Sequence, residues 1–164
     1  MHPAIAFVGE QAGDQEDLQG RPFVSTTGQP FGHALDEVDI DRRRAYITNA
    51  VRRLKFVQRG KRRLHQSPMV GEIKHYRRWL EKEVEFVHLK LVVALGASAV
   101  QALEGKAVTI TRGRTPRKFI GLDEHSVQVT VHPSYLLRLP SDEDRERAYK
   151  AFLLDLKRIR ALAH

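Results

Sequence analysis

The chain has 164 residues, a hydrophobic content of 41% and a formal net charge of +8. A chain of this length can bury roughly two-thirds of its unfolded surface, so we expect one domain that folds independently and spans residues 1–164. The absence of cysteine excludes disulfides, thiolate metal clusters and cysteine nucleophiles, and it favours a reducing cytoplasm. We expect neither a secretion signal nor a membrane span, because no apolar run approaches the ~18 residues that a span needs.

Segments with strand-like and helix-like patterns alternate along the chain. The predicted strands cover residues 4–8, 44–49, 90–95 and 127–131. The predicted helices cover residues 30–38, 70–87 and 97–103, and a long final helix follows the capping residue Ser141. Residues 105–124 are irregular and suggest a hairpin-like excursion. The alternation predicts an α/β fold: a single-domain three-layer sandwich in which a central, mainly parallel, four-stranded sheet carries helices on both faces.

Charge is distributed unevenly, and this bears on the partner. Ten basic residues and no acidic ones lie between Arg42 and Arg63, whereas the segment from Glu10 to Asp41 holds eight acidic residues and one basic residue. Such a basic run favours a polyanion such as nucleic acid, although a solvated arm is the alternative interpretation. The run leads directly to His65, whose imidazole could act on whatever the cations hold.

Several segments at the predicted strand ends resemble a known family. They are GEQAGDQED (9–17), GRPFV (20–24), YITNAV (46–51) and HPS (132–134). In residues and in order they are similar to motifs of the uracil-DNA glycosylase superfamily. The segment GKRRLHQSP (60–68) resembles the insert of the UdgX group within that superfamily. Since these segments run from the first predicted strand to the last, the resemblance covers nearly the whole chain.

The resemblance implies an enzyme that flips uracil out of DNA and excises it, and it assigns a role to each matched residue. Phe23 would stack on the flipped base, and Asn49 would read its N3–H and O4 with an amide acceptor and donor. Gly9 would allow close approach of the backbone, while Glu10 and Gln11 would lie near the base and sugar. A core aromatic and a turn-forming asparagine are the structural alternatives for Phe23 and Asn49.

The resemblance also assigns roles around the last predicted strand and the basic insert. His132 would donate to uracil O2 and stabilise the departing anion, unless it is merely structural. The residues implied in contacts with the DNA backbone, or in wedging of the duplex, are Lys61, Arg62, Arg63, Ser134, Leu136 and Arg138.

His65 decides which chemistry follows excision. If the insert works as in the UdgX group, the His65 imidazole attacks the anomeric carbon and the protein stays covalently joined to the abasic sugar. Three alternatives remain open: a turnover glycosylase without crosslinking, a non-catalytic module that binds uracil or abasic sites, or an exposed His65 that only adds contact. The expected partners are uracil-containing DNA, single- or double-stranded, and abasic-site DNA, bound by a monomer associated with the nucleoid.

The chain also departs from the family pattern. Members of the group normally carry an iron-sulfur cluster with cysteine ligands, which a chain without cysteine cannot form, so we expect no cofactor and no metal. Tyr76 stands where a relative has a ligand cysteine, and we expect packing around Tyr76 and Trp79 to replace the cluster's structural role. Ala12 replaces a usual proline, and residues 25–27 replace a Gly-Pro-rich turn, which leaves the mouth of the uracil pocket open to question.

Overall fold

A computed structural model describes residues 4–25, 28–52, 55–87, 89, 91–104 and 126–164. The excursion expected over residues 105–124 lies outside these residues. In the part of the chain that is described, no helix combines the length and the apolar composition that a membrane span requires.

The centre of the fold is a sheet of four parallel strands, as predicted. The strands β1 (Ile5–Gln11), β2 (Ala45–Val51), β5 (Leu91–Leu95) and β6 (Ser126–Thr130) are arranged in the order β2-β1-β5-β6. The expectation that Gly9 ends the first strand is wrong. Gly9 pairs with Asn49 and Gln11 pairs with Val51, so β1 continues to Gln11. As a result, Glu10 and Gln11 lie on a rigid strand rather than in a loop.

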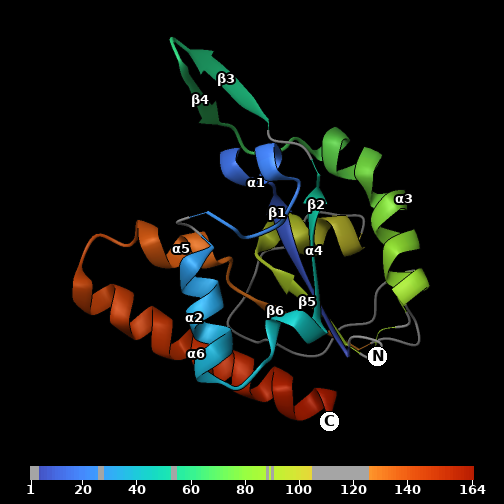
Figure 1. Ribbon diagram of the computed structural model, residues 1–164, viewed down its shortest axis with the longest axis vertical. Helices are drawn as coiled ribbons and strands as arrows, with labels where there is room; N and C mark the ends of the chain where they lie inside the picture. The colour runs from blue at the N-terminus through green and yellow to red at the C-terminus, as the bar shows by residue number, and fades with distance from the viewer. Residues whose placement is uncertain (1–3, 26–27, 53–54, 88, 90, 105–125) are drawn as a thin grey trace.

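Helices cover both faces of the sheet and complete three layers (Figure 1). The helices α2 (Gln29–Glu37), α5 (Pro133–Arg138) and α6 (Asp142–Ala163) lie on one face, and α3 (Val70–Val87) and α4 (Ala97–Glu104) lie on the other. Alternate residues of β1 enter different cores: Ile5 and Phe7 pack under α2 and α6, whereas Ala6 and Val8 pack under α3 and α4. This alternation follows from the period of two along a strand.

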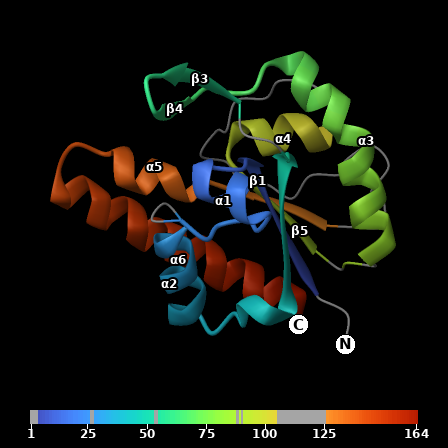
Figure 2. The same cartoon turned by 45° about the horizontal axis from the view of Figure 1, so that its top comes forward.

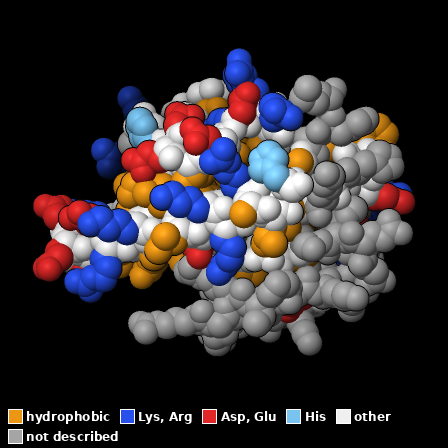
Figure 3. Space-filling model, turned by 90° about the horizontal axis from the view of Figure 1, so that it is seen from below, with side chains coloured by type: hydrophobic (Ala, Val, Ile, Leu, Met, Phe, Trp, Pro, Cys, Tyr) orange, Lys and Arg blue, Asp and Glu red, His pale blue; other side chains and the backbone are white. Residues whose placement is uncertain are grey.

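The long helices agree with the sequence patterns except at their margins. The hydroxyl of Ser141 accepts a hydrogen bond from the backbone N–H of Asp144 at 3.1 Å and caps α6 as predicted. On the coloured part of the face seen from below, acidic and basic side chains are intermingled (Figure 3). On α3 the sequence predicts that packing around Tyr76 and Trp79 takes the place of a cluster. Tyr76 packs against the core only in part, and Trp79 is 51% exposed, so Trp79 does not fill the interior as expected.

Three elements were not predicted. They are the helix α1 (Asp14–Gln19), the 3-10 turn η1 (Arg42–Arg44) and a hairpin made of β3 (Phe56–Arg59) and β4 (Arg62–His65). The two hairpin strands pair antiparallel with each other and form a sheet of their own. Figures 1 and 2 show the hairpin and α1 beyond the carboxyl ends of the parallel strands, where ligands bind in such folds.

Candidate active site

Gly9 brings Asn49 and Phe23 together at the carboxyl ends of β1 and β2. A Cβ atom at Gly9 would lie 2.5 Å from Asn49 Oδ1 and 2.8 Å from Phe23 Cζ. Any larger residue would push these two side chains apart. The structure therefore gives Gly9 the role of allowing close approach, and it places two of the predicted base-contacting residues side by side.

The ring of Phe23 is part of the core and part of the site at once. It is 8% exposed and lies 4.9 Å from the ring of Phe31, but it also faces His132 with a ring separation of 5.7 Å and an interplanar angle of 32°. Its backbone φ is 52°, in the left-handed region that residues other than glycine rarely adopt. Surrounding contacts must hold such a conformation in place.

Hydrogen bonds on both sides hold the segment that carries Phe23. The guanidinium of Arg42 donates to the backbone carbonyls of Pro22 and Phe23 at 2.8 and 3.0 Å. Burial, and secondarily the charge of Arg21, lowers the pKa of the Arg42 guanidinium. On the other side, the backbone N–H and the hydroxyl of Ser25 donate to Glu16 Oε1 at 3.2 and 2.8 Å. Ser25, one of the residues that replace the family's Gly-Pro-rich turn, thus anchors this segment to α1.

Asn49 presents a buried acceptor that has no hydrogen-bond partner among the described residues. Its Oδ1 atom is shielded from solvent and accepts no bond there. Leaving such an atom unpaired costs about 1–3 kcal/mol. An acceptor of this kind beside an aromatic ring fits a ligand that brings its own N–H group.

His132 is held as a neutral hydrogen-bond donor. It is the N-cap of α5, and its Nδ1 accepts from the backbone N–H of Ser134 at 3.1 Å, with the Ser134 hydroxyl 2.8 Å away. Because Nδ1 accepts, the proton of the neutral ring lies on Nε2. Burial lowers the pKa of His132 to about 4, against a smaller opposing effect of the Glu10 carboxylate. At neutral pH the ring can therefore donate from Nε2 without carrying charge.

Gln11 and Glu10 meet His65 at the end of β1. The Gln11 side chain, 7% exposed, accepts from the backbone N–H of Lys55 at 3.2 Å and donates to the carbonyl of Gln66 at 2.6 Å. These bonds fix the amide orientation, so its second N–H donates to His65 Nε2 at 2.7 Å. His65 Nε2 is also 3.7 Å from Glu10 Oε1. With the amide as the donor, the acceptor in this bond is the lone pair of His65 Nε2, and the His65 side chain remains 53% exposed.

The basic run divides into cations that hold the protein together and cations that are free for a partner. Arg63 forms ion pairs with Asp14 and Asp17 of α1 and lies 5.0 Å above the ring of Phe56, so it ties the hairpin to the body of the protein. The residues Lys61 and Arg62 are exposed and have no ion-pair partner in the described ranges.

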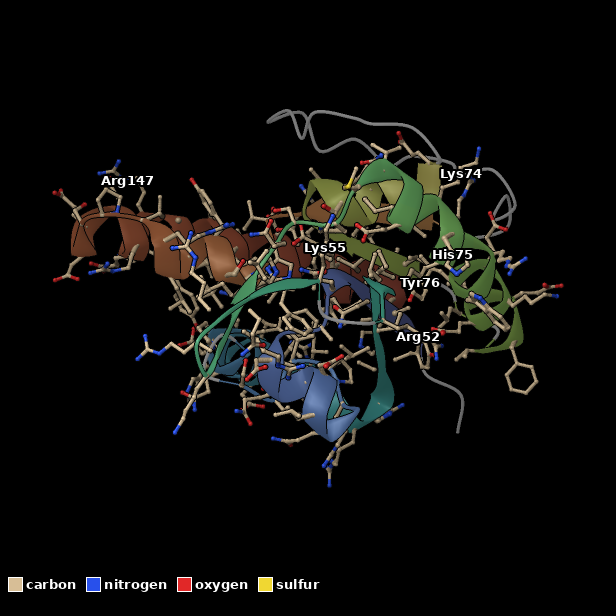
Figure 4. All side chains as sticks on the ribbon, turned by 90° about the horizontal axis from the view of Figure 1, so that it is seen from above. Arg52, Lys55, Lys74, His75, Tyr76 and Arg147 are labelled. Atoms are coloured by element: carbon tan, nitrogen blue, oxygen red, sulfur yellow. The ribbon has the colours of Figure 1, made fainter. Side chains whose placement is uncertain are left out.

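Other cations of the run also join elements. Arg52 pairs with Glu83, and Lys55 pairs with Glu72 at 3.1 Å, so both connect the segments around the hairpin to α3. Figure 4 shows Lys55 near the centre of the view from above, with Arg52 nearer to α3. This side of the molecule is therefore less positive than the sequence suggests.

The short helix α5 requires one correction. Leu136, expected to wedge into DNA, is 4% exposed and belongs to the core beneath α5, so it cannot reach a duplex from this position. The exposed apolar side chains of this helix are Tyr135 and Leu137, which are 41% and 44% exposed. Arg138 is exposed in the last turn of α5.

The residues present do not fit an iron-sulfur cluster. The sequence contains no cysteine, and the described residues contain no group of three or more histidine, aspartate or glutamate side chains placed to hold a metal. Thiolates are the ligands that such clusters require.

Two contributors to the site were missed from sequence. Ser98 donates from its hydroxyl to Glu10 Oε2 at 2.7 Å across 88 positions of sequence. Gly96, with φ of 90°, packs against His132, where an added Cβ would lie 3.1 Å from that of His132. Both contacts join segments that are far apart in the sequence, so nothing local to residues 95–98 signals them.

Comparison with known proteins identifies relatives of this chain. Residues 1–157 match the family described as the uracil DNA glycosylase superfamily. A type-4 uracil-DNA glycosylase of Thermotoga maritima is 36% identical over 143 residues, which cover 86% of this chain and 70% of the relative. A type-4 uracil-DNA glycosylase of Sulfurisphaera tokodaii is 28% identical over 166 residues, covering 97% and 70% of the two chains.

Proposed function

The chain belongs to the uracil-DNA glycosylase superfamily and is a DNA N-glycosylase, and we propose that after it excises uracil from DNA it becomes covalently joined to the abasic sugar through His65. The proposal has three steps: recognition of the flipped base, departure of uracil, and capture of the sugar. Each step is supported by a separate part of the site.

Recognition rests on Phe23 and Asn49. The flipped pyrimidine stacks on the ring of Phe23, and its N3–H donates to the buried Asn49 Oδ1 that has no partner among the described residues. Cytosine has a lone pair instead of a proton at N3 and presents a donor where uracil has O4. An amide oriented for uracil therefore leaves unpaired groups against cytosine, which is a strong basis for discrimination.

Departure rests on His132 and Glu10. As the bond between C1′ and N1 breaks, both electrons leave with uracil, and charge develops on its O2 atom. The neutral His132 donates to that oxygen from Nε2, and one such positioned donor contributes roughly 10²- to 10³-fold in rate. The Glu10 carboxylate lies close enough to His132 to act on its pKa, and it stabilises the positive charge that develops on the sugar.

Capture rests on His65. Its Nε2 lone pair leaves the hydrogen bond from Gln11 and forms a bond to C1′, so the imidazole becomes a cation. Loss of the Nδ1 proton to solvent, and uptake of a proton by the uracil anion, leave a neutral adduct and free uracil. The observation that carries this proposal is the position of His65 Nε2, 3.7 Å from Glu10 Oε1 on a hairpin anchored by Arg63.

A turnover glycosylase is the second candidate, because Glu10 could equally orient a water molecule toward C1′. Incubation with a uracil oligonucleotide, followed by a denaturing gel, separates the candidates. A heat-stable shifted band is the expected result, whereas a free abasic product would support turnover and no reaction would support a binding module. Single-stranded and duplex oligonucleotides are run in parallel, because we propose that a monomer accepts both.

The nucleophile is tested with one variant and a matched control. His65→Ala should abolish the shifted band, while His75→Ala, which removes an exposed histidine on α3, should leave it unchanged. Persistence of the band in His65→Ala would reject His65 as the attacking group.

A further inference from the structure

The Glu10 carboxylate is held between two elements that are far apart in the sequence. One oxygen, Oε2, accepts a hydrogen bond from the Ser98 hydroxyl at 2.7 Å, and the other, Oε1, lies 3.7 Å from His65 Nε2. The Glu10 side chain is 28% exposed, so water can reach it. A carboxylate with several rotatable bonds needs a partner to keep one orientation in such a place.

Ser98 is well placed to be that partner. It is the second residue of α4, which follows directly on the fully buried strand β5. A negative charge is also favoured beside the first turn of a helix. Gly96, which immediately precedes α4, has a φ of 90° and leaves room for the Cβ atom of His132. The start of α4 therefore orients two groups on which the proposed chemistry depends.

We propose that Ser98 is a positioning residue that directs Glu10 toward His65 and thereby sets how often excision ends in the covalent adduct rather than in a free abasic site. This inference rests on the proposed capture by His65. After uracil leaves, C1′ can bond to His65 Nε2, or it can bond to a water oxygen that loses a proton. Glu10 stabilises the cationic sugar in both cases. Only a fixed orientation of Glu10, however, keeps the sugar cation next to the His65 imidazole.

The test compares Ser98→Ala with Ser98→Thr in the full-length protein. Single-turnover reactions on a uracil oligonucleotide are resolved on one denaturing gel, which gives the excision rate and the ratio of adduct to free abasic product. A hydrogen bond to a charged group corresponds to roughly a tenfold change or more, so Ser98→Ala should lower this ratio about tenfold. Excision should fall by a smaller factor than this ratio, since Glu10 keeps its charge and can still stabilise the cationic sugar.

The threonine variant distinguishes a positioning role of the Ser98 hydroxyl from a general structural effect of changing this residue. Threonine retains the hydroxyl, so Ser98→Thr should restore the ratio to within about twofold of the wild type. Ser141→Ala, which removes a helix cap far from the site, should leave the ratio unchanged. A ratio in Ser98→Ala equal to that of the wild type, or one in Ser98→Thr as low as in Ser98→Ala, would overturn the inference.

A second measurement covers the case in which the wild type forms no adduct and the proposed capture fails. The ¹⁵N and ¹H signals of the His65 imidazole, assigned with His65→Ala, report on the surroundings of that ring. They should move in Ser98→Ala and return in Ser98→Thr if Ser98 orients Glu10 against His65. Unchanged signals in Ser98→Ala would refute the positioning role independently of any crosslink.

Discussion

The guanidinium of Arg42 donates a hydrogen bond of 3.0 Å to the backbone carbonyl of Phe23. The first cation of the basic run therefore holds the aromatic side chain of the site, rather than a phosphate. It does so where the backbone needs support, because Phe23 has a φ of 52°. The proposed stacking surface for the base thus depends on a residue of η1.

Arg42→Ala should lower both stability and uracil excision. Two carbonyls lose a charged donor, which we expect to cost about 1–3 kcal/mol in the free energy of unfolding, measured by urea denaturation. Excision should fall through a higher KM, because the ring of Phe23 loses its fixed position. The matched control is Arg44→Ala, an exposed residue of the same turn. Equal losses in both variants would show that the loss of one positive charge is responsible, and not the loss of the hydrogen bonds from Arg42 to the two carbonyls.

Arg63→Ala and Arg62→Ala should have different effects although the residues are adjacent. Arg63 ties the hairpin to Asp14 and Asp17, so its loss should reduce the yield of adduct while the salt dependence of DNA binding stays nearly unchanged. Arg62 is exposed and has no ion-pair partner among the described residues. If it contacts a phosphate, its loss should reduce the slope of log affinity against log salt by about one. Binding titrations over a range of salt concentrations, with gels for the adduct, measure both.

The double variant Arg63→Asp with Asp17→Arg tests the hairpin anchor directly. Restoration of the ion pair in the opposite sense should recover part of the adduct yield lost in Arg63→Asp alone. If the double variant is no better than the single one, the pair does not position His65.

Stability should fall as the pH drops from about 6.5 to about 4, in part because of His132. Its pKa is lowered to about 4 in the folded protein by burial, whereas an unfolded histidine has a pKa near 6.5. Between these values the unfolded chain binds more protons, so the free energy of unfolding rises with pH and the contribution is complete above about 6.5. The expected change is on the order of 3 kcal/mol.

The measurement is a set of urea unfolding curves between pH 4 and pH 8. His132→Ala should show a shallower slope of stability against pH than the wild type, whatever its absolute stability. A slope identical to that of the wild type would mean that another group carries the dependence.

Leu136→Ala and Leu137→Ala should affect different properties. Leu136 is buried at 4% exposure, so its truncation should destabilise the fold by about 2–5 kcal/mol. Leu137 is 44% exposed, so its truncation should leave the melting temperature nearly unchanged and slow excision from duplex more than from single-stranded DNA, where no partner base must be displaced. Equal effects on both substrates would reject a wedge at Leu137.

Much of the scaffold was predictable because its signals are local. The buried strands and the periodic helices, including α3 with its bounds at Val70 and Val87, follow from the alternation of apolar residues. The end of β1 was misjudged because Gly9 looks like a breaker, yet it is required by the close approach of Asn49 and Phe23. The rule that glycine ends a strand failed at Gly9 because pairing of β1 with β2 continues through this residue.

The residue types of the site were predictable, but the hydrogen bonds that position them were not. Asn49, Phe23 and His132 were placed together by resemblance, and the structure brings them together. The bonds from Ser98 to Glu10 and from Arg42 to the Phe23 carbonyl join distant segments, so no local pattern indicates them. The burial of Leu136 rather than Leu137 depends on the helical phase of α5, which sequence alone does not fix in so short a helix.

The hairpin completes its backbone ladder internally and is attached to the body through side chains such as Gln11 and Arg63. Removing or exchanging it would break no rung of the four-stranded sheet. In the proposed mechanism the capturing imidazole is thus carried on a segment outside the four-stranded sheet. Insertion or deletion of this segment in a glycosylase of the same architecture would then add or remove self-capture and leave Phe23 and Asn49 in place.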